Sequence, residues 1–279
     1  MSGLLENRVS VVTGGSRGIG KAIAAAFLRE GSRCVIAARS RDELGGTRRE
    51  LAAIGPRLEA FAADVGAEDD VRSLIEYTLR KFGRIDVLVN CAGVLGPIGP
   101  TAETDAAAWW DTLRVNLLGT FLCVRYAVPR MLSQGRGKVI NLSGGGATSP
   151  LPRFSAYACS KAAVVRLTET LAEELKGTGI DVNTIAPGAV NTRLLDDVLA
   201  AGESAGEERA RKLRQLEDGG TPPQRAAELA VFLASENSDG LTGRLISAVW
   251  DDWPAMAPLI PQIMSSDLYT LRRVTATGR

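Results

Sequence analysis

The sequence predicts an α/β protein: a single doubly wound domain with a seven-stranded, mainly parallel sheet flanked by helices. Short β-branched runs alternate with longer amphipathic stretches along the chain, and this pattern is typical of parallel strands joined by helical crossovers. The chain has 279 residues, of which 45% are hydrophobic, and this length suits one large core. No Pro-rich or Ser-rich linker and no repeat divides it, so no internal boundary is expected.

Each expected strand is a short run rich in β-branched or small apolar residues. In chain order the strands are Arg8–Thr13, Arg33–Ala38, Leu58–Ala63, Asp86–Asn90, Lys138–Leu142, Ile180–Ile185 and Arg244–Val249. Helical patterns fill the intervals between them. Ligands bind beyond the carboxyl ends of the strands in such a sheet, so functional residues are expected at that edge.

Two regions depart from the alternation. Residues 191–220 are charged and helical in pattern, with glycines as interruptions, and this composition favours a substrate lid. Residues 251–279 follow the last strand and are interpreted as a C-terminal extension. Residues 1–250 then form the main domain.

Composition excludes several classes of protein. The formal net charge is +1, so no basic excess attracts nucleic acid or an anionic membrane. Met1–Asn7 lacks the features of a secretion signal, and no apolar run reaches the roughly 20 residues that a membrane span needs. We therefore expect a cytoplasmic protein.

The histidine and cysteine content narrows the chemistry. Histidine is absent, which removes Ser-His and Cys-His nucleophilic machinery and the usual metal motifs. The four cysteines have no C-x-x-C spacing, and this pattern favours reduced thiols over a disulfide framework or a zinc site. No metal is expected.

A glycine-rich loop, Thr13–Gly20, directly follows the first strand and leads into a helical stretch. Its glycines, Gly14, Gly18 and Gly20, permit a tight turn and close approach of a phosphate, and the helix N-terminus offers free N–H groups to a pyrophosphate. The strand–turn–helix context favours a Rossmann-type dinucleotide site over a plain turn.

The end of the second strand bears on the choice of cofactor. A site that prefers NAD places an acidic residue there to bond the ribose 2′-hydroxyl, but this chain has Ala38-Arg39-Ser40. A cation beside small residues accommodates a 2′-phosphate, and Arg17 in the glycine loop adds a second charge. The sequence therefore predicts NADP(H) rather than NAD(H), with two solvated surface arginines as the alternative.

A candidate proton-transfer pair lies further along the chain. Tyr157 and Lys161 are four residues apart in a helical pattern, so their side chains leave the same face. An adjacent ammonium favours the phenolate and allows a tyrosine to exchange protons with an alcohol or carbonyl oxygen. Ser143 follows the fifth strand at its carboxyl end, where its hydroxyl can meet the same oxygen. Taken separately, these residues also fit a surface pair and a turn serine.

Taken together, the motifs resemble the short-chain dehydrogenase/reductase family. The glycine loop, Asp64-Val65, Asn90-Cys-Ala-Gly93, Asn116, Ser143, Tyr157-x-x-x-Lys161 and Pro187-Gly188 fall in that family's order and spacing over roughly residues 6–250. The resemblance implies a dinucleotide-binding and catalytic domain. It also implies that Tyr157 is the acid/base, that Lys161 lowers the tyrosine pKa and binds the nicotinamide ribose, that Ser143 orients the substrate oxygen, and that Asn116 holds a water linking Lys161 to solvent.

The resemblance also implies a set of cofactor contacts. Asp64 and Val65 flank the adenine, Asn90 and Gly93 lie on the adenosine ribose side, and Pro187-Gly188 contacts the nicotinamide. The full expected set is Gly14, Ser16, Arg17, Gly18, Ile19, Gly20, Ala38, Arg39, Ser40, Asp64, Val65, Asn90, Ala92, Gly93, Tyr157, Lys161, Pro187, Gly188, Val190 and Thr192.

Three departures from the family pattern bear on the pocket and on subunit contacts. Cys91 stands where the family more often has a second asparagine, Gly144–Gly146 loosen the segment after Ser143, and Trp250–Trp253 replaces a short exit from the last strand. An apolar pocket wall is expected from Leu151, Pro152, Phe154, Leu194 and Leu195, whereas Arg153 and Arg193 either hold an anionic substrate group or are surface charges.

The sequence thus predicts an NADP(H)-dependent oxidoreductase that interconverts a carbonyl and an alcohol on a small-molecule substrate. The alternatives are an NAD-dependent alcohol or sugar dehydrogenase and a catalytically inactive nucleotide-binding protein of the same fold. The family resemblance implies a homotetramer or homodimer built on the helices that carry Asn116 and Tyr157.

Overall fold

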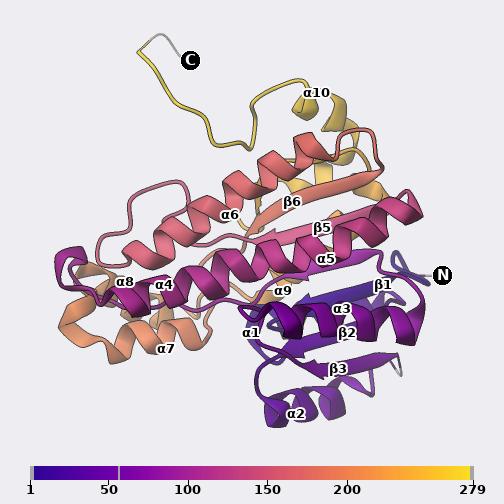
Figure 1. Cartoon of the computed structure of the whole chain (residues 1–279). Helices are drawn as coiled ribbons and strands as arrows, with labels where there is room; N and C mark the ends of the chain where they lie inside the picture. The colour runs from indigo at the N-terminus through magenta and orange to yellow at the C-terminus, as the bar shows by residue number, and fades with distance from the viewer. Residues whose placement is uncertain (1–2, 56, 277–279) are drawn as a thin grey trace.

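A seven-stranded sheet organises the chain (Figure 1). The computed structural model describes residues 3–55 and 57–276, so residues 1, 2 and 56 of the predicted domain and 277–279 of the predicted extension lie outside it. Within the described residues the strand order is β3-β2-β1-β4-β5-β6-β7. The strands are β1 (Val9–Thr13), β2 (Arg33–Ala38), β3 (Leu58–Ala62), β4 (Val87–Asn90), β5 (Gly137–Leu142), β6 (Ile180–Ala186) and β7 (Leu245–Ser247).

Every strand pair is parallel, which confirms the doubly wound α/β prediction. The sequence placed each strand correctly, and the largest difference is at β7, which was expected to run to Val249 and ends at Ser247. The strand order reverses direction between β1 and β4. At this switch point, ligands bind beyond the carboxyl ends of the strands.

Helices cover both faces of the sheet. Their bounds are α1 (Gly18–Arg29), α2 (Arg41–Leu51), α3 (Glu68–Phe82), α4 (Ala106–Leu113), α5 (Gly119–Gln134), α6 (Ser155–Glu174), α7 (Arg193–Ala200), α8 (Glu207–Glu217), α9 (Pro223–Ala234) and α10 (Ile260–Met264). In Figure 1, α3, α5 and α6 lie in front of the sheet and α9 lies behind it. Alternate strand residues face opposite sides. In β2, Cys34 and Ile36 join the core under α1 and α9, whereas Val35 and Ala37 join the core under α3 and α5.

A π-helical turn separates α4 from α5. It spans Arg114–Leu118 and carries Asn116. Such a turn inserts an extra residue into a helix and occurs frequently at functional sites. Asn116 thus lies within an otherwise helical stretch that runs from α4 to α5.

The segment expected to be a lid is helical. Residues 191–220 form α7 and α8 with a 3-10 turn between them. Val198 of α7 and Ala205 of the turn form a small apolar cluster with Leu95, Phe154 and Tyr157. This segment therefore packs on the carboxyl edge of the sheet rather than extending it.

The C-terminal extension folds back onto the domain. Trp253 packs against Phe232 of α9, with ring centroids 6.0 Å apart. The buried Arg244 donates hydrogen bonds to the carbonyls of Ile263 and Ser266, and the Leu245 N–H donates to the Tyr269 carbonyl. The extension thus covers the outer edge of β7. None of the described helices is long and apolar enough to cross a membrane.

Candidate active site

Two adjoining cavities lie at the carboxyl ends of the strands. The first, which we call the nucleotide cavity, has a volume of about 450 Å³, and the second, the reaction cavity, about 180 Å³. They share Ile19, Cys91, Gly93, Thr192 and Leu194 as lining residues. A ligand that fills the first therefore reaches the second.

Most predicted cofactor residues line one of these cavities. Those of the nucleotide cavity are Gly14, Ser16, Arg17, Gly18, Ile19, Gly20, Ala38, Arg39, Ser40, Asp64, Val65, Ala92, Gly93 and Thr192. Those of the reaction cavity include Tyr157, Lys161, Pro187, Gly188 and Val190. Asn90 lines neither cavity, and its buried side-chain amide donates to Asn141 at 2.9 Å.

The glycine loop fits a dinucleotide. Gly14 and Gly18 adopt φ values of 65° and 54°, in the left-handed region that favours glycine. A methyl group on Gly20 would overlap the Gly14 carbonyl, and one on Gly18 would lie 3.3 Å from the Thr192 side chain. Only a loop without side chains at these positions leaves room above the N-terminus of α1, where N–H groups attract a pyrophosphate.

The outer end of the nucleotide cavity holds a carboxylate that the sequence reading missed. Glu43 of α2 accepts hydrogen bonds from the Ser16 hydroxyl and from the Arg17 guanidinium, both at 2.9 Å. Its own N–H donates to Ser40, the N-cap residue of α2, at 3.2 Å. The spacing of Ser40 and Glu43 is that of a capping box. This pattern would have placed Glu43 in the first turn of α2, at the edge of the cavity.

Asp64 also lines the nucleotide cavity, two residues after the end of β3. Its carboxylate accepts from the Gly66 N–H at 2.9 Å and pairs with Arg114 at 3.1 Å. Burial opposes ionisation of Asp64, but the Gly66 hydrogen bond and the Arg114 charge prevail and lower its pKa. Asp64 is therefore a fixed, ionised acceptor that closes this side of the cavity.

Ser143, Tyr157 and Lys161 meet in the reaction cavity. Ser143 follows β5, whereas Tyr157 and Lys161 lie on one face of α6, and all three side chains are buried. The Lys161 ammonium lies 5.7 Å from the centre of the Tyr157 ring and donates to the Leu142 carbonyl at 2.9 Å. The structure thus brings a hydroxyl, a phenol and an ammonium to one small space.

Asn116 is linked by hydrogen bonds to the helix that carries Tyr157 and Lys161. Its amide group donates to the Val94 carbonyl and to the Ser160 hydroxyl, each at 2.9 Å, and its carbonyl oxygen accepts from the Val94 N–H at 2.8 Å. Ser160 in turn donates to the Tyr157 carbonyl at 2.7 Å. Asn116 does not line the reaction cavity, and it contacts α6 through Ser160.

Burial dominates the acid–base properties of the pair. It raises the pKa of Tyr157 to about 12, with a smaller contribution from Cys91, and lowers the pKa of Lys161 to about 8. The sequence expectation was that the ammonium lowers the tyrosine pKa. The net pKa of Tyr157 is nevertheless raised, because removal of the phenol from water disfavours its charged form. At neutral pH the phenol therefore keeps its proton and the lysine its charge.

Gly144 abuts the phenol. A methyl group at this position would overlap the Tyr157 hydroxyl, whereas one at Gly145 would only touch Leu151 at 3.7 Å. The run of glycines after Ser143 is therefore not merely loose: its first member leaves the space that the tyrosine hydroxyl occupies.

The rest of the reaction cavity is mostly apolar. Leu151, Phe154, Leu194 and Leu195 line it as expected, joined by Leu95 and Val198. Pro152 and Arg153 do not line it, and Arg193 lines the nucleotide cavity instead. Arg153 donates to the Ser204 carbonyl at 3.2 Å. Two charged residues of α8, Glu208 and Lys212, also reach the reaction cavity.

Cys91 lines both cavities where the family pattern has asparagine. Burial raises the pKa of its thiol to about 11, so the thiol stays protonated at neutral pH and is a poor nucleophile. Among the described residues, no group of three or more Cys, Asp or Glu side chains can hold a metal ion.

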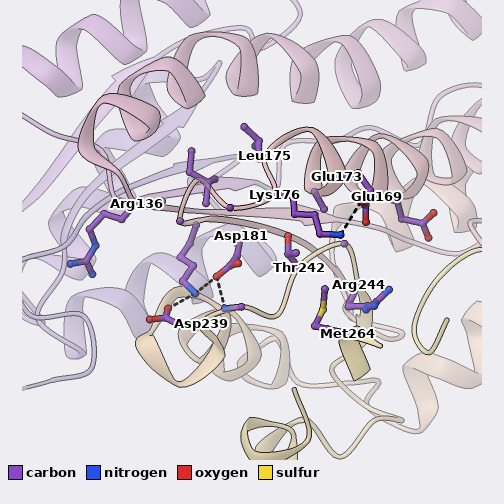
Figure 2. Close-up of a pocket in the computed structure, with 18 of the residues that line it drawn as sticks. Arg136, Glu169, Glu173, Leu175, Lys176, Asp181, Asp239, Thr242, Arg244 and Met264 are labelled. Carbon is purple, nitrogen blue, oxygen red and sulfur yellow. Dashed lines mark hydrogen bonds and ion pairs between the residues drawn. The ribbon is translucent and has the colours of Figure 1, made fainter. Parts of the chain in front are cut away.

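A larger hollow of about 1090 Å³ lies at the other end of the sheet, beside the amino ends of β5 and β6 (Figure 2). Several of its charged side chains form ion pairs with one another. Lys138 pairs with Asp181 and with Asp239 at 2.7 Å, and Lys176 pairs with Glu173. It contains none of the predicted cofactor or catalytic residues, so the reaction site is assigned to the carboxyl edge.

Comparison with known proteins identifies the family. The sequence model of the short chain dehydrogenase family matches residues 8–202. The chain belongs to the short-chain dehydrogenase/reductase family. This confirms the resemblance drawn from the motifs, and it makes the protein an oxidoreductase by family.

Individual members of the family are similar over most of the chain. A 2-(S)-hydroxypropyl-CoM dehydrogenase of Xanthobacter autotrophicus is 34% identical over 87% of this chain and 95% of its own length. A 3-oxoacyl-[acyl-carrier-protein] reductase of Thermotoga maritima is 32% identical over 87% and 96%. Among solved structures, an actinorhodin polyketide ketoreductase variant with NADPH has a TM-score of 0.81 at 30% identity, covering 88% of this chain and 97% of that one.

Proposed function

We propose that this short-chain dehydrogenase/reductase is an NADP(H)-dependent enzyme that interconverts a carbonyl and an alcohol on a small, largely apolar molecule, with reduction as its favoured direction. One observation carries the proposal: Ser143, Tyr157 and Lys161 line a small cavity that opens into a cavity built for a dinucleotide. A nicotinamide cofactor, when bound, supplies or accepts the hydride. The chain's own residues donate and accept the proton on the substrate oxygen.

Tyr157 is the proposed acid/base. Its buried phenol is protonated at neutral pH, and it can donate that proton to a carbonyl oxygen as the oxygen gains charge. The Ser143 hydroxyl would hold the same oxygen in place. The Lys161 ammonium stabilises the phenolate that proton donation leaves behind. Asn116 positions the catalytic helix through Ser160, and the role of a water held at Asn116 stays a prediction.

Arg39 is the proposed contact of the cofactor's 2′-phosphate. It lines the nucleotide cavity and forms no ion pair with a carboxylate among the described residues. Arg39→Ala should raise the Kd for NADPH roughly tenfold or more and leave the Kd for NADH nearly unchanged, because only NADPH carries the additional charge. Titration of cofactor fluorescence measures both constants. Arg41→Ala, a neighbouring arginine outside the cavity, is the matched control. Equal losses for both cofactors would contradict the NADP(H) assignment.

Gly144 offers a test of the reaction cavity. Gly144→Ala should lower kcat at least tenfold, because the added methyl group occupies the space of the Tyr157 hydroxyl, and small displacements of a reacting group are costly. Gly145→Ala adds the same methyl group one residue along, in ordinary contact with Leu151, and should change kcat far less. Steady-state kinetics measures kcat for both variants and tests this difference. Similar rates in the two variants would mean that the phenol is not the reacting group.

An NAD-dependent alcohol or sugar dehydrogenase is the second candidate, and Glu43 is the observation that favours it, since a carboxylate in this cavity can accept from a ribose hydroxyl. Nicotinamide absorbance, followed with each cofactor over a panel of carbonyls and alcohols, separates the two candidates. Faster turnover with NADH than with NADPH across the panel would favour the second.

Three further expectations accompany the proposal. We propose that residues 191–220 are the substrate lid, because α7 and the following turn pack on Phe154 and Tyr157. A homodimer or homotetramer through α4–α6 is supported by the exposed side chains of Trp110, Leu118 and Phe121 on that face. Cytoplasmic location stays a prediction.

A further inference from the structure

The two arginines expected to bind a 2′-phosphate differ in whether they already form an ion pair with a carboxylate. Arg39 has no carboxylate within ion-pair distance in the described part of the chain, whereas Arg17 is held by Glu43 at 2.9 Å. Glu43 also accepts from the Ser16 hydroxyl at 2.9 Å. All four side chains line the nucleotide cavity. One carboxylate thus occupies two of the donors that a phosphate at this end of the cavity would use.

The hydrogen bonds that Glu43 accepts from Arg17 and Ser16 have opposite consequences for binding of the two cofactors. A 2′-phosphate can take Arg17 and Ser16 only if Glu43 releases them, and it then lies beside a carboxylate of like charge. A ribose with a free 2′-hydroxyl carries no such charge, and Glu43 is an acceptor for its proton. The same side chain therefore penalises NADP(H) and is neutral or favourable for NAD(H).

We propose that Glu43 is a determinant of cofactor specificity: by holding Arg17 and Ser16, it weakens binding of a 2′-phosphorylated nucleotide relative to its unphosphorylated counterpart. The inference rests on the proposed use of a nicotinamide nucleotide in this cavity. It does not depend on which cofactor the unchanged protein prefers. Glu43 is absent from the set of cofactor residues that the family resemblance implied.

The solvent exposure of the Arg17–Glu43 ion pair limits how much Glu43 can change the affinity for a phosphorylated nucleotide. The side chains of Arg17 and Glu43 are 49% and 40% exposed, and exposed ion pairs are individually weak. Direct repulsion between Glu43 and the phosphate adds to the cost of releasing Arg17. Removal of the charge should therefore improve binding of the phosphorylated nucleotide by about three- to tenfold, with the effect shrinking as salt is raised.

The test uses redox-inactive fragments as well as cofactors. Glu43→Gln keeps the size of the side chain and removes its charge. Calorimetric titration of this variant with 2′,5′-ADP and with 5′-AMP, and fluorescence titration with NADPH and NADH, gives four Kd values. We expect tighter binding of 2′,5′-ADP and NADPH, with 5′-AMP and NADH unchanged or weakened. Glu43→Ala repeats the test without a side-chain amide.

Two controls isolate the contact. Asp42→Asn removes the neighbouring charge in the same first turn of α2, but Asp42 does not line the cavity, so the ratio of Kd values should stay as in the unchanged protein. In an Arg17→Ala background, Glu43→Gln should shift the ratio less, because the held cation is gone. This double-mutant comparison separates release of Arg17 from direct repulsion.

The outcomes also separate this inference from the proposed function. A shifted Kd ratio in a protein that natively prefers NADH would uphold the role of Glu43 and reject the NADP(H) assignment. Equal changes for phosphorylated and unphosphorylated nucleotides, or a shift that Asp42→Asn reproduces, would overturn the role of Glu43 whichever cofactor the protein prefers.

Discussion

Tyr157→Phe is expected to lower kcat by roughly 10²- to 10⁴-fold, the range that a positioned general acid contributes. The substitution removes one oxygen atom. In the described part of the chain the phenol hydroxyl forms no hydrogen bond, so the folded state loses no partner. The ring keeps its place among Leu95, Phe154 and Val198, and the nucleotide cavity keeps its lining.

Binding and turnover should therefore separate in this variant. The Kd for NADPH, measured by fluorescence titration, should stay within about threefold, while single-turnover absorbance shows the loss in the chemical step. Tyr126→Phe is the matched control, because Tyr126 loses the same atom at an exposed hydrogen bond to Glu68. A Tyr157→Phe variant that keeps most of its turnover would show that another group delivers the proton.

Much of the fold was predictable because local patterns and global packing agree. The run Arg33–Ala38 has apolar residues that serve two cores at once, with Cys34 and Ile36 on one face and Val35 and Ala37 on the other. A strand buried on both faces in this way reads as a continuous apolar run. The proximity of Tyr157 and Lys161 was predictable for a similar reason: a helix fixes the relative direction of the two side chains, whatever surrounds them.

The features that were missed depend on contacts between distant segments. The hydrogen bonds from Ser16 and Arg17 to Glu43 join residues more than 25 positions apart, and only the capping spacing with Ser40 gave a local sign of Glu43. The space that Gly144 leaves for Tyr157 depends on contact between the loop after β5 and α6, where Gly144 lies against Tyr157 and Gly146 against Ala158. The direction of the tyrosine pKa follows from burial, which spacing along the chain does not report.

Burial also sets the pH at which Lys161 loses its proton, and with it the expected pH dependence of the rate. Lys161→Met should lower kcat for reduction at least a hundredfold, because the phenolate formed on proton donation loses its stabilising cation. In the unchanged protein the rate should fall above about pH 8, where Lys161 loses its proton. The methionine variant should lack this fall. Rates measured from pH 6 to 10 test both statements, with the exposed Lys176→Met as the matched control.

The same substitution should not destabilise the fold at neutral pH. The pKa of Lys161 is about 8 in the folded protein against 10.5 for the free side chain. Below pH 8 both the folded and unfolded states carry the charge, so the folded state bears the full cost of burying it. Between pH 8 and 10.5 the unfolded state binds more protons, and stability rises with pH. Chemical unfolding of the unchanged protein should therefore show a gain in free energy of unfolding over this window relative to Lys161→Met. A gap between the two proteins that stays constant with pH would mean that burial does not lower the pKa of Lys161 in the folded protein, and a fall in rate above about pH 8 would then need another cause.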